Sequence, residues 1–241
     1  TETISELKEQ VELSKIKLEE DLNRISDLQS REEQQKSLLR GEQVRQQKIV
    51  RNLSTKEKNL QKELEEKKRI ARRIESEIAK LLEEERKRGA ITELTPEQRL
   101  IGESFEENKG RLPWPVERGI ITSKFGIQHH PVLKYVTEDN IDIEITSSGN
   151  TPVRSVFKGD VARVFAIPGA NMAVIIRHGR YLTVYQNLVN VIVKAGDKVS
   201  TNQKIGTVFA DKDDGDKAIL KFMVFEEKSK MDPELWISKK N

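Results

Sequence analysis

Four side chains able to bind a metal ion lie close together in the middle of the sequence. His129 and His130 are adjacent, and Glu138 and Asp142 follow after a short segment. A catalytic zinc ion takes three protein ligands of this kind and keeps one position open for water. One interpretation is a metal site formed by either histidine with both carboxylates. The interpretation that we favour is that the histidines are loop residues bonded to the backbone and that Asp142 is a structural hydrogen-bond acceptor.

The rest of the composition restricts the chemistry further. The chain holds three histidines and no cysteine, so a thiolate metal site, a disulfide framework and a cysteine nucleophile are excluded. The third histidine, His178, precedes Gly179 and is interpreted as a residue of a tight hairpin turn.

The residues beyond Gly110 have the character of an all-β domain, which we place at residues 112–241. Glycine, proline and asparagine separate short runs rich in Val, Ile, Phe and Tyr. Strands so short and so closely spaced indicate an antiparallel sandwich or half-barrel. The expected strands lie near residues 120–125, 141–145, 153–157, 160–166, 172–177, 181–188, 204–209 and 218–226.

Residues 1–90 are predicted to form an α-helical coiled coil. They contain no proline, one glycine before residue 89, which is Gly41, and apolar residues that recur at intervals of three and four. A continuous helix would extend about 130 Å and would need a partner helix to bury its apolar stripe. Two arrangements stay open. One is a hairpin that turns within residues 30–54, where Ser54 and Glu57 resemble a capping box, and the other is an intermolecular dimer.

A linker with a short helix is predicted at residues 91–111. Thr95 is the expected N-cap, Pro96 the first helical residue and Gln98 the residue that completes the capping box, and Gly110 lies just past the end. The apolar residues of this helix are Leu100, Ile101 and Phe105.

The charge pattern argues against nucleic acid as a partner. Forty-three basic and forty acidic residues give a formal net charge of +3, and in the N-terminal part the two signs alternate, as on a solvated surface. No apolar run is long enough to span a bilayer. Because the chain begins inside a helical pattern without an initiator methionine, we expect a mature or truncated chain whose export signal has been removed.

A series of motifs between residues 112 and 237 resembles the LytM-type (lysostaphin-like) peptidase family in order and spacing. They include RLPWPV at 111–116, SKFGIQHHPV at 123–132, NIDI at 140–143, NTPV at 150–153, VKAGDKV at 193–199 and QKIG at 203–206. The resemblance implies the fold of that family for the β domain.

The sequence departs from this family at the positions of its chemistry. Active members bind zinc through an HxGxD motif and the second histidine of an HxH motif. Here Asp142 keeps the aspartate, while Glu138, Asn187, Ile219 and Lys221 stand where the family has histidines. An ammonium group offers no lone pair to a metal. We therefore expect no zinc, no other cofactor and no peptidase activity.

What remains at this site is predicted to be a partner-binding groove open to solvent. In the strand 218–226 side chains alternate, so that Leu220, Phe222 and Val224 face the core. An apolar face with an adaptable methionine suits an amphipathic helix or peptide; the alternative is that Met223 and Phe225 pack under a neighbouring loop. The predicted groove consists of Glu138, Asp142, Asn187, Ile219, Lys221, Met223 and Phe225.

A degenerate LytM-type domain behind a coiled coil resembles the EnvC-like murein hydrolase activators. The resemblance implies an N-acetylmuramoyl-L-alanine amidase as partner, an FtsEX-type membrane complex at the coiled coil, and a role in peptidoglycan remodelling during cell division. It implies a periplasmic or cell-envelope location. Two alternatives are a zinc-dependent peptidoglycan endopeptidase with an atypical metal site and a periplasmic adaptor protein of a transport pump.

A further hypothesis concerns regulation. The helix at residues 96–109 would cover Ile219, Met223 and Phe225 in the resting state and withdraw when a membrane partner moves the coil. Alternatively, it would cap the sandwich away from the groove.

Overall fold

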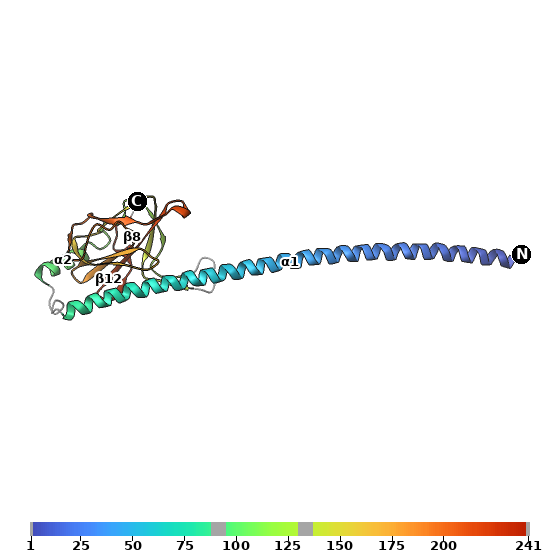
Figure 1. Cartoon of the computed structure of the whole chain (residues 1–241), viewed down its shortest axis with the longest axis horizontal. Helices are drawn as coiled ribbons and strands as arrows, with labels where there is room; N and C mark the ends of the chain where they lie inside the picture. The colour runs from blue at the N-terminus through green and yellow to red at the C-terminus, as the bar shows by residue number, and fades with distance from the viewer. Residues whose placement is uncertain (1, 88–94, 130–136, 240–241) are drawn as a thin grey trace. The chain divides into compact units, whose positions relative to one another are not determined.

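The computed structural model describes residues 2–87, 95–129 and 137–239, and it divides into two compact units, 1–63 and 64–241. The first unit consists of the N-terminal part of helix α1 (Glu2–Lys87). The second unit contains the rest of α1, helix α2 (Pro96–Glu107) and the β domain (Figure 1). The compact unit that carries the β domain therefore begins inside the predicted coil.

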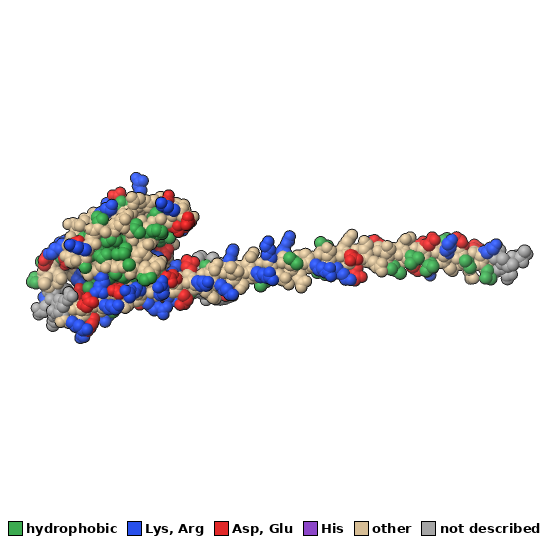
Figure 2. Space-filling view, in the orientation of Figure 1, with side chains coloured by type: hydrophobic (Ala, Val, Ile, Leu, Met, Phe, Trp, Pro, Cys, Tyr) green, Lys and Arg blue, Asp and Glu red, His purple; other side chains and the backbone are tan. Residues whose placement is uncertain are grey.

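Helix α1 is continuous, so the hairpin turn considered for residues 30–54 is not present. Ser54 lies within the helix and caps nothing. The next residue, Thr55, donates its hydroxyl hydrogen bond to the carbonyl of Arg51 one turn earlier, at 3.0 Å, which a helix tolerates. Figure 2 shows Lys and Arg interspersed with Asp and Glu along α1. In the described part of the first unit, apolar side chains such as Leu18 and Leu22 are more than half exposed. This stripe still requires a partner.

Helix α2 begins as the sequence predicts. The Thr95 side chain accepts from the backbone N–H of Gln98, and the Gln98 side chain accepts from that of Thr95. The helix lies against the turn that contains Gly179, whose φ is +66°. A Cβ on Gly179 would lie 2.7 Å from the Cα of Gly102 in α2, so glycine is required for this close approach.

The β domain is an antiparallel sheet, which confirms the predicted fold class. Its main path has the order β1-β4-β12-β8-β7-β6-β9, with β5, β10, β11 and β13 paired to its side and β2–β3 forming a separate hairpin. All eight predicted strands are present, and the strands that were not predicted are short. The bounds are β1 Ile120–Ser123, β2 Gly126–His129, β3 Thr137–Asn140, β4 Ile143–Ser148, β5 Pro152–Arg154, β6 Gly159–Ala166, β7 Met172–His178, β8 Tyr181–Val189, β9 Lys198–Val199, β10 Lys204–Val208, β11 Ala210–Asp211, β12 Lys217–Glu226 and β13 Ser229–Met231.

Strand β12 lies between two hydrophobic cores, of which the alternation of its side chains predicted one. Leu220, Phe222 and Val224 belong to the larger core, which Phe105 of α2 also enters. Met223 and Phe225 point to the opposite face and belong to a second core.

The second core is formed with the C-terminal part of α1. Residues 64–87, which we call the covering segment, place side chains one and two turns apart on this face of the sheet. Ile74, Ile78 and Leu81 are each at most 6% exposed. The face predicted to be an open groove is therefore covered by the chain's own helix. The apolar residues of the covering segment in this core are Ile74, Ile78, Leu81 and Leu82, with Ile70 and Ala71 packed at its edge.

Candidate functional site: a charged cluster at the end of a covered groove

Two neighbouring strands place charged side chains on the covered face of the sheet. In the register of β12 and β4, Lys221 lies opposite Glu144, and in the register of β12 and β8 it lies opposite Gln186. Asp142 comes just before β4. Because side chains two residues apart share a face in a strand, Asp142 and Glu144 both face Lys221.

The Lys221 ammonium group joins these carboxylates. Its Nζ lies 2.7 Å from Oε1 of Glu144 and 3.9 Å from the nearer oxygen of Asp142. Burial alone would lower the pKa of Lys221, but the charges of Asp142 and Glu144 outweigh it and raise that pKa above its ordinary value. Lys221 is therefore a permanent cation at neutral pH.

The two carboxyl groups respond differently to this cation. Burial raises the pKa of Asp142, and the more distant Lys221 only partly offsets it. Burial acts on Glu144 in the same direction, but its charge and hydrogen-bond interactions with Lys221 dominate and hold its pKa below the usual value. The ion pair is therefore centred on Lys221 and Glu144, with Asp142 as a second carboxyl group. Glu144 was not predicted as a site residue, although its spacing of two from Asp142 on a strand was a usable signal.

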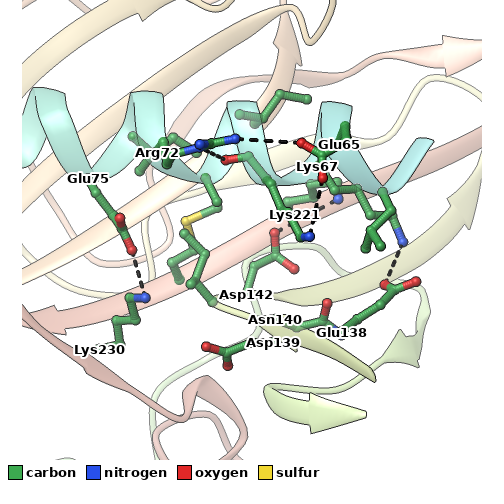
Figure 3. Close-up of a pocket in the computed structure, with 17 residues that line it drawn as sticks. Glu65, Lys67, Arg72, Glu75, Glu138, Asp139, Asn140, Asp142, Lys221 and Lys230 are labelled. Atoms are coloured by element: carbon green, nitrogen blue, oxygen red, sulfur yellow. Dashed lines mark hydrogen bonds and ion pairs between the residues drawn. The ribbon is translucent and has the colours of Figure 1, made fainter. Parts of the chain in front are cut away.

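Glu138 lies at the same end of the groove and contacts the covering segment. Its Oε2 is 3.1 Å from Nζ of Lys67. These side chains line a cavity of about 470 Å³ between the covering segment and β12. Figure 3 shows Lys67 reaching toward Glu138, and Lys221 and Asp142 pointing toward each other. The cavity is thus lined by charges of both signs.

Asn187 and Ile219 take structural positions beside this cluster. The Asn187 amide group donates to the carbonyl of Ile219 at 2.7 Å and accepts from Asn171 at 2.7 Å. Asn187 has a φ of +74°, a conformation that asparagine tolerates better than most residues. The side chain of Ile219 is half-buried outside the second core.

His178 lies outside the charged cluster. His178 is fully buried at the end of β7, where Nδ1 lies 2.7 Å from the carbonyl oxygen of Lys158 and Nε2 lies 2.9 Å from Oγ1 of Thr183. Burial lowers its pKa to about 4, so the ring is neutral at pH 7. His130 lies outside the described residues, and of His129 only the backbone is described.

Helix α2 does not occupy the groove, contrary to the regulatory hypothesis. Phe105 stacks on Trp236, with ring centroids 4.9 Å apart, and on Tyr181 in the larger core. Leu100 is 64% exposed, and Ile101 is half-buried. The aromatic cluster offers Phe105 a deeper site than the groove, which the covering segment already fills. Helix α2 therefore caps the β domain away from the groove.

Comparison with known proteins places this geometry in context. Residues 138–233 match the family model described as Peptidase family M23. The β domain is of the M23 peptidase type. The chain is also 33% identical, over 113 residues, to the peptidoglycan DD-endopeptidase ShyA of Vibrio cholerae, a match that covers 44% of this chain and 26% of that protein. The chain thus spans about a quarter of the length of the curated relative that it matches.

Solved structures are similar to the M23-type domain as well. One of Csd3 from Helicobacter pylori has a TM-score of 0.46 at 23% identity and covers 55% of this chain and 36% of that chain. A zinc-containing peptidase from Vibrio cholerae has a TM-score of 0.44 at 26% identity and covers 54% of this chain and 41% of that chain.

Two described side chains, Lys221 and Asn187, do not fit the zinc ligand set that the LytM-type resemblance implies. Lys221 places an ammonium group where a ligand lone pair is needed, and Asn187 has its amide group committed to the backbone of Ile219. Among residues 2–87, 95–129 and 137–239, no group of three His, Cys, Asp or Glu side chains is arranged to hold a metal ion. No described helix has the length and apolar character to cross a membrane.

Proposed function

We propose that this protein is a non-catalytic regulator of peptidoglycan hydrolysis, which activates a cell-wall N-acetylmuramoyl-L-alanine amidase by binding it through the degenerate peptidase groove. The observation that carries this proposal is the α-helix that already fills the groove. A surface that buries Ile74, Ile78 and Leu81 of one helix has the shape and polarity to bind another.

The chemistry of the cluster supports binding rather than hydrolysis. Peptide hydrolysis by this class of domain needs a metal ion that activates water and polarises a carbonyl group. Lys221 and Glu144 instead form an ion pair at 2.7 Å, which neutralises both groups and leaves neither free to act on a substrate.

Access to the groove then requires displacement of the covering segment. Each fully buried Ile or Leu side chain contributes about 1.5–3 kcal/mol, so the covering helix holds the groove closed without making it inaccessible. The four buried side chains of the covering segment together favour the closed state by about 6–12 kcal/mol, so a partner must supply differential binding energy of at least this size. An amidase helix that makes equivalent contacts supplies a binding free energy of this size, and a membrane partner that moves α1 adds to it.

The exposed stripe of α1 supports a second interaction. Leu7, Val11, Leu18 and Leu22 are each more than half exposed, and a helix with such a stripe associates with other helices. We propose that an FtsEX-type membrane complex binds here in the periplasm or cell envelope, either directly or through a coiled-coil dimer.

An assay on purified peptidoglycan tests the proposal. The intact chain alone, with and without added zinc, should release no fragments, whereas the chain with a cell-wall amidase should raise the amidase rate. Phe225→Asp, which places a charge in the groove, should abolish the activation. Leu235→Asp, at an exposed position, is the matched control and should activate normally.

The relative named as an endopeptidase supports a competing function, hydrolysis of peptide cross-links. The same assay separates the two. Cross-link cleavage by the chain alone that a chelator abolishes would establish the endopeptidase and overturn the regulator.

A further inference from the structure

We infer that the groove recognises a charge-polarised helix: the partner helix carries two or more carboxylates on its C-terminal turns beside its apolar stripe, and these bind Arg163 and Arg177. The inference rests on the proposed function and deepens it by specifying the chemistry of the partner. It follows from how the covering segment pairs with the β domain along its length.

The basic end of the groove is formed by arginines on neighbouring strands. Arg163 of β6 binds two carboxylates of the covering segment, Glu77 at 2.7 Å and Glu84 at 2.6 Å. Arg177 of β7 binds Glu85. The side chains of Arg163 and Arg177 are only 20% and 9% exposed. Since a buried charge without a partner is costly, a helix that displaces the covering segment must bring carboxylates of its own.

Arg177 has spare donor capacity for such a ligand. Its Nη1 donates to the carbonyl of Gly179 and its Nη2 to Glu85, but its buried Nε has no hydrogen-bond partner among the described residues. A guanidinium group binds a carboxylate most strongly when two nitrogens engage both oxygens. The site therefore favours a carboxylate that approaches Arg177 side-on.

At the opposite end of the groove, the covering segment presents cations to acceptors of the β domain. Glu138 binds Lys67 of the covering segment at 3.1 Å, and the carbonyl of Pro168 accepts from Arg69 at 2.8 Å. The helix thus presents cations at its first turns and carboxylates at its last turns. This polarity fixes the direction in which a partner helix can lie.

The spacing of apolar and acidic residues in the covering segment defines the motif expected in the partner helix. Counted from Ile74 as the first apolar residue, the apolar positions follow at +4 and +7, and the carboxylates at +3, +10 and +11. The residues of the covering segment at these positions are Ile78, Leu81, Glu77, Glu84 and Glu85.

A peptide-binding experiment tests the inference. The full chain with Ile74→Asp and Ile78→Asp, which weaken the covering segment, is titrated with a fluorescent peptide of residues 64–87. A second peptide carries Glu→Gln at 77, 84 and 85. A third, of equal net charge, carries Glu→Gln at 65, 66 and 83, whose carboxylates pair with cations of the helix itself.

The second peptide should bind at least about tenfold more weakly than the native one, and the third within about twofold of it. Arg163→Glu in the protein should likewise weaken binding of the native peptide. The same variant should bind a peptide that carries Glu77→Lys and Glu84→Lys more tightly than the native peptide. Equal affinity of all three peptides, or no binding of the native peptide, would overturn the inference.

Hydrogen exchange in a chain without the Ile74→Asp and Ile78→Asp substitutions gives a second test, which applies even if that double variant does not fold. Arg163→Gln and Arg177→Gln should speed hydrogen exchange across residues 66–87 at least about tenfold, and unchanged exchange would overturn the inference. Neither experiment contains an amidase. The peptidoglycan assay measures amidase activation separately. If peptide binding does not depend on charge but the chain activates the amidase, this inference alone is rejected. If peptide binding depends on charge but the chain does not activate the amidase, the proposed function is rejected.

Discussion

Lys221 is the residue on which the chemistry of the site depends. Its ammonium group lies 2.7 Å from Glu144 and 3.9 Å from Asp142, two carboxyl groups around the start of β4. Lys221 thus places a permanent positive charge beside both carboxyl groups. The groove was expected to be open to solvent. Lys221 is instead largely covered, with 20% of its side chain exposed.

Replacement of Lys221 by methionine should destabilise the second unit by about 3–5 kcal/mol at pH 7, because it leaves Glu144 and Asp142 largely buried beside each other without the cation nearest to them. Their pKa values should then rise above the unfolded values. The folded state would bind more protons, so the lost stability should partly return as the pH falls through the raised pKa values. Urea unfolding followed by tryptophan fluorescence measures this. Adding Glu144→Gln should recover most of the loss, and a deficit that does not vary with pH would contradict the account.

His178 should make the β domain acid-sensitive. Burial lowers its pKa to about 4, below the ordinary value of about 6.5. Between these values the unfolded state binds the extra proton, so stability should fall by about 3 kcal/mol as the pH drops from 6.5 to 4. In His178→Gln this component of the pH dependence should disappear. An identical slope in both proteins, measured by urea unfolding across this range, would show that the ring is not held neutral.

At the scale of elements, the two helices of the second unit have separate tasks. Helix α2 completes the larger core through Phe105, while residues 64–87 of α1 cover the groove. The capping box of Thr95 and Gln98 and the alternation along β12 were predictable, because both depend on local spacing. Which of the two helices covers the groove was not predictable from the sequence. An apolar stripe such as that of Ile74 and Ile78 shows that a helix needs cover, but periodicity does not say which surface supplies it.

Phe105→Ala tests the assignment of α2 to the larger core. Truncating a fully buried aromatic residue that stacks on Trp236 should cost about 3–5 kcal/mol of unfolding free energy. Amidase activation per folded molecule should not change, because Phe105 does not contact the groove. Leu100→Ala, at an exposed position on the same helix, should cost less than about 0.5 kcal/mol. A small loss in Phe105→Ala with a large change in activation would assign α2 to the groove after all.

At the scale of the whole molecule, one helix contributes to both units. Between residues 7 and 63 it carries an exposed apolar stripe, and residues 64–87 cover the groove of the M23-type domain. The predicted boundaries of 1–90, 91–111 and 112–241 follow changes in composition and stay a prediction. The compact unit follows packing instead and begins at Leu64, because an amphipathic helix belongs to whatever buries its stripe.

Locking the covering segment tests the central claim most directly. Glu75 and Lys230 form an ion pair across the groove edge at 2.7 Å, and the chain has no cysteine, so Glu75→Cys with Lys230→Cys gives a unique pair for a reductant-cleavable bis-maleimide. The cross-linked chain should fail to activate the amidase, and cleavage of the linker should restore activation. Equal activation before and after cleavage would show that the partner binds elsewhere and that the covered groove is not the functional site.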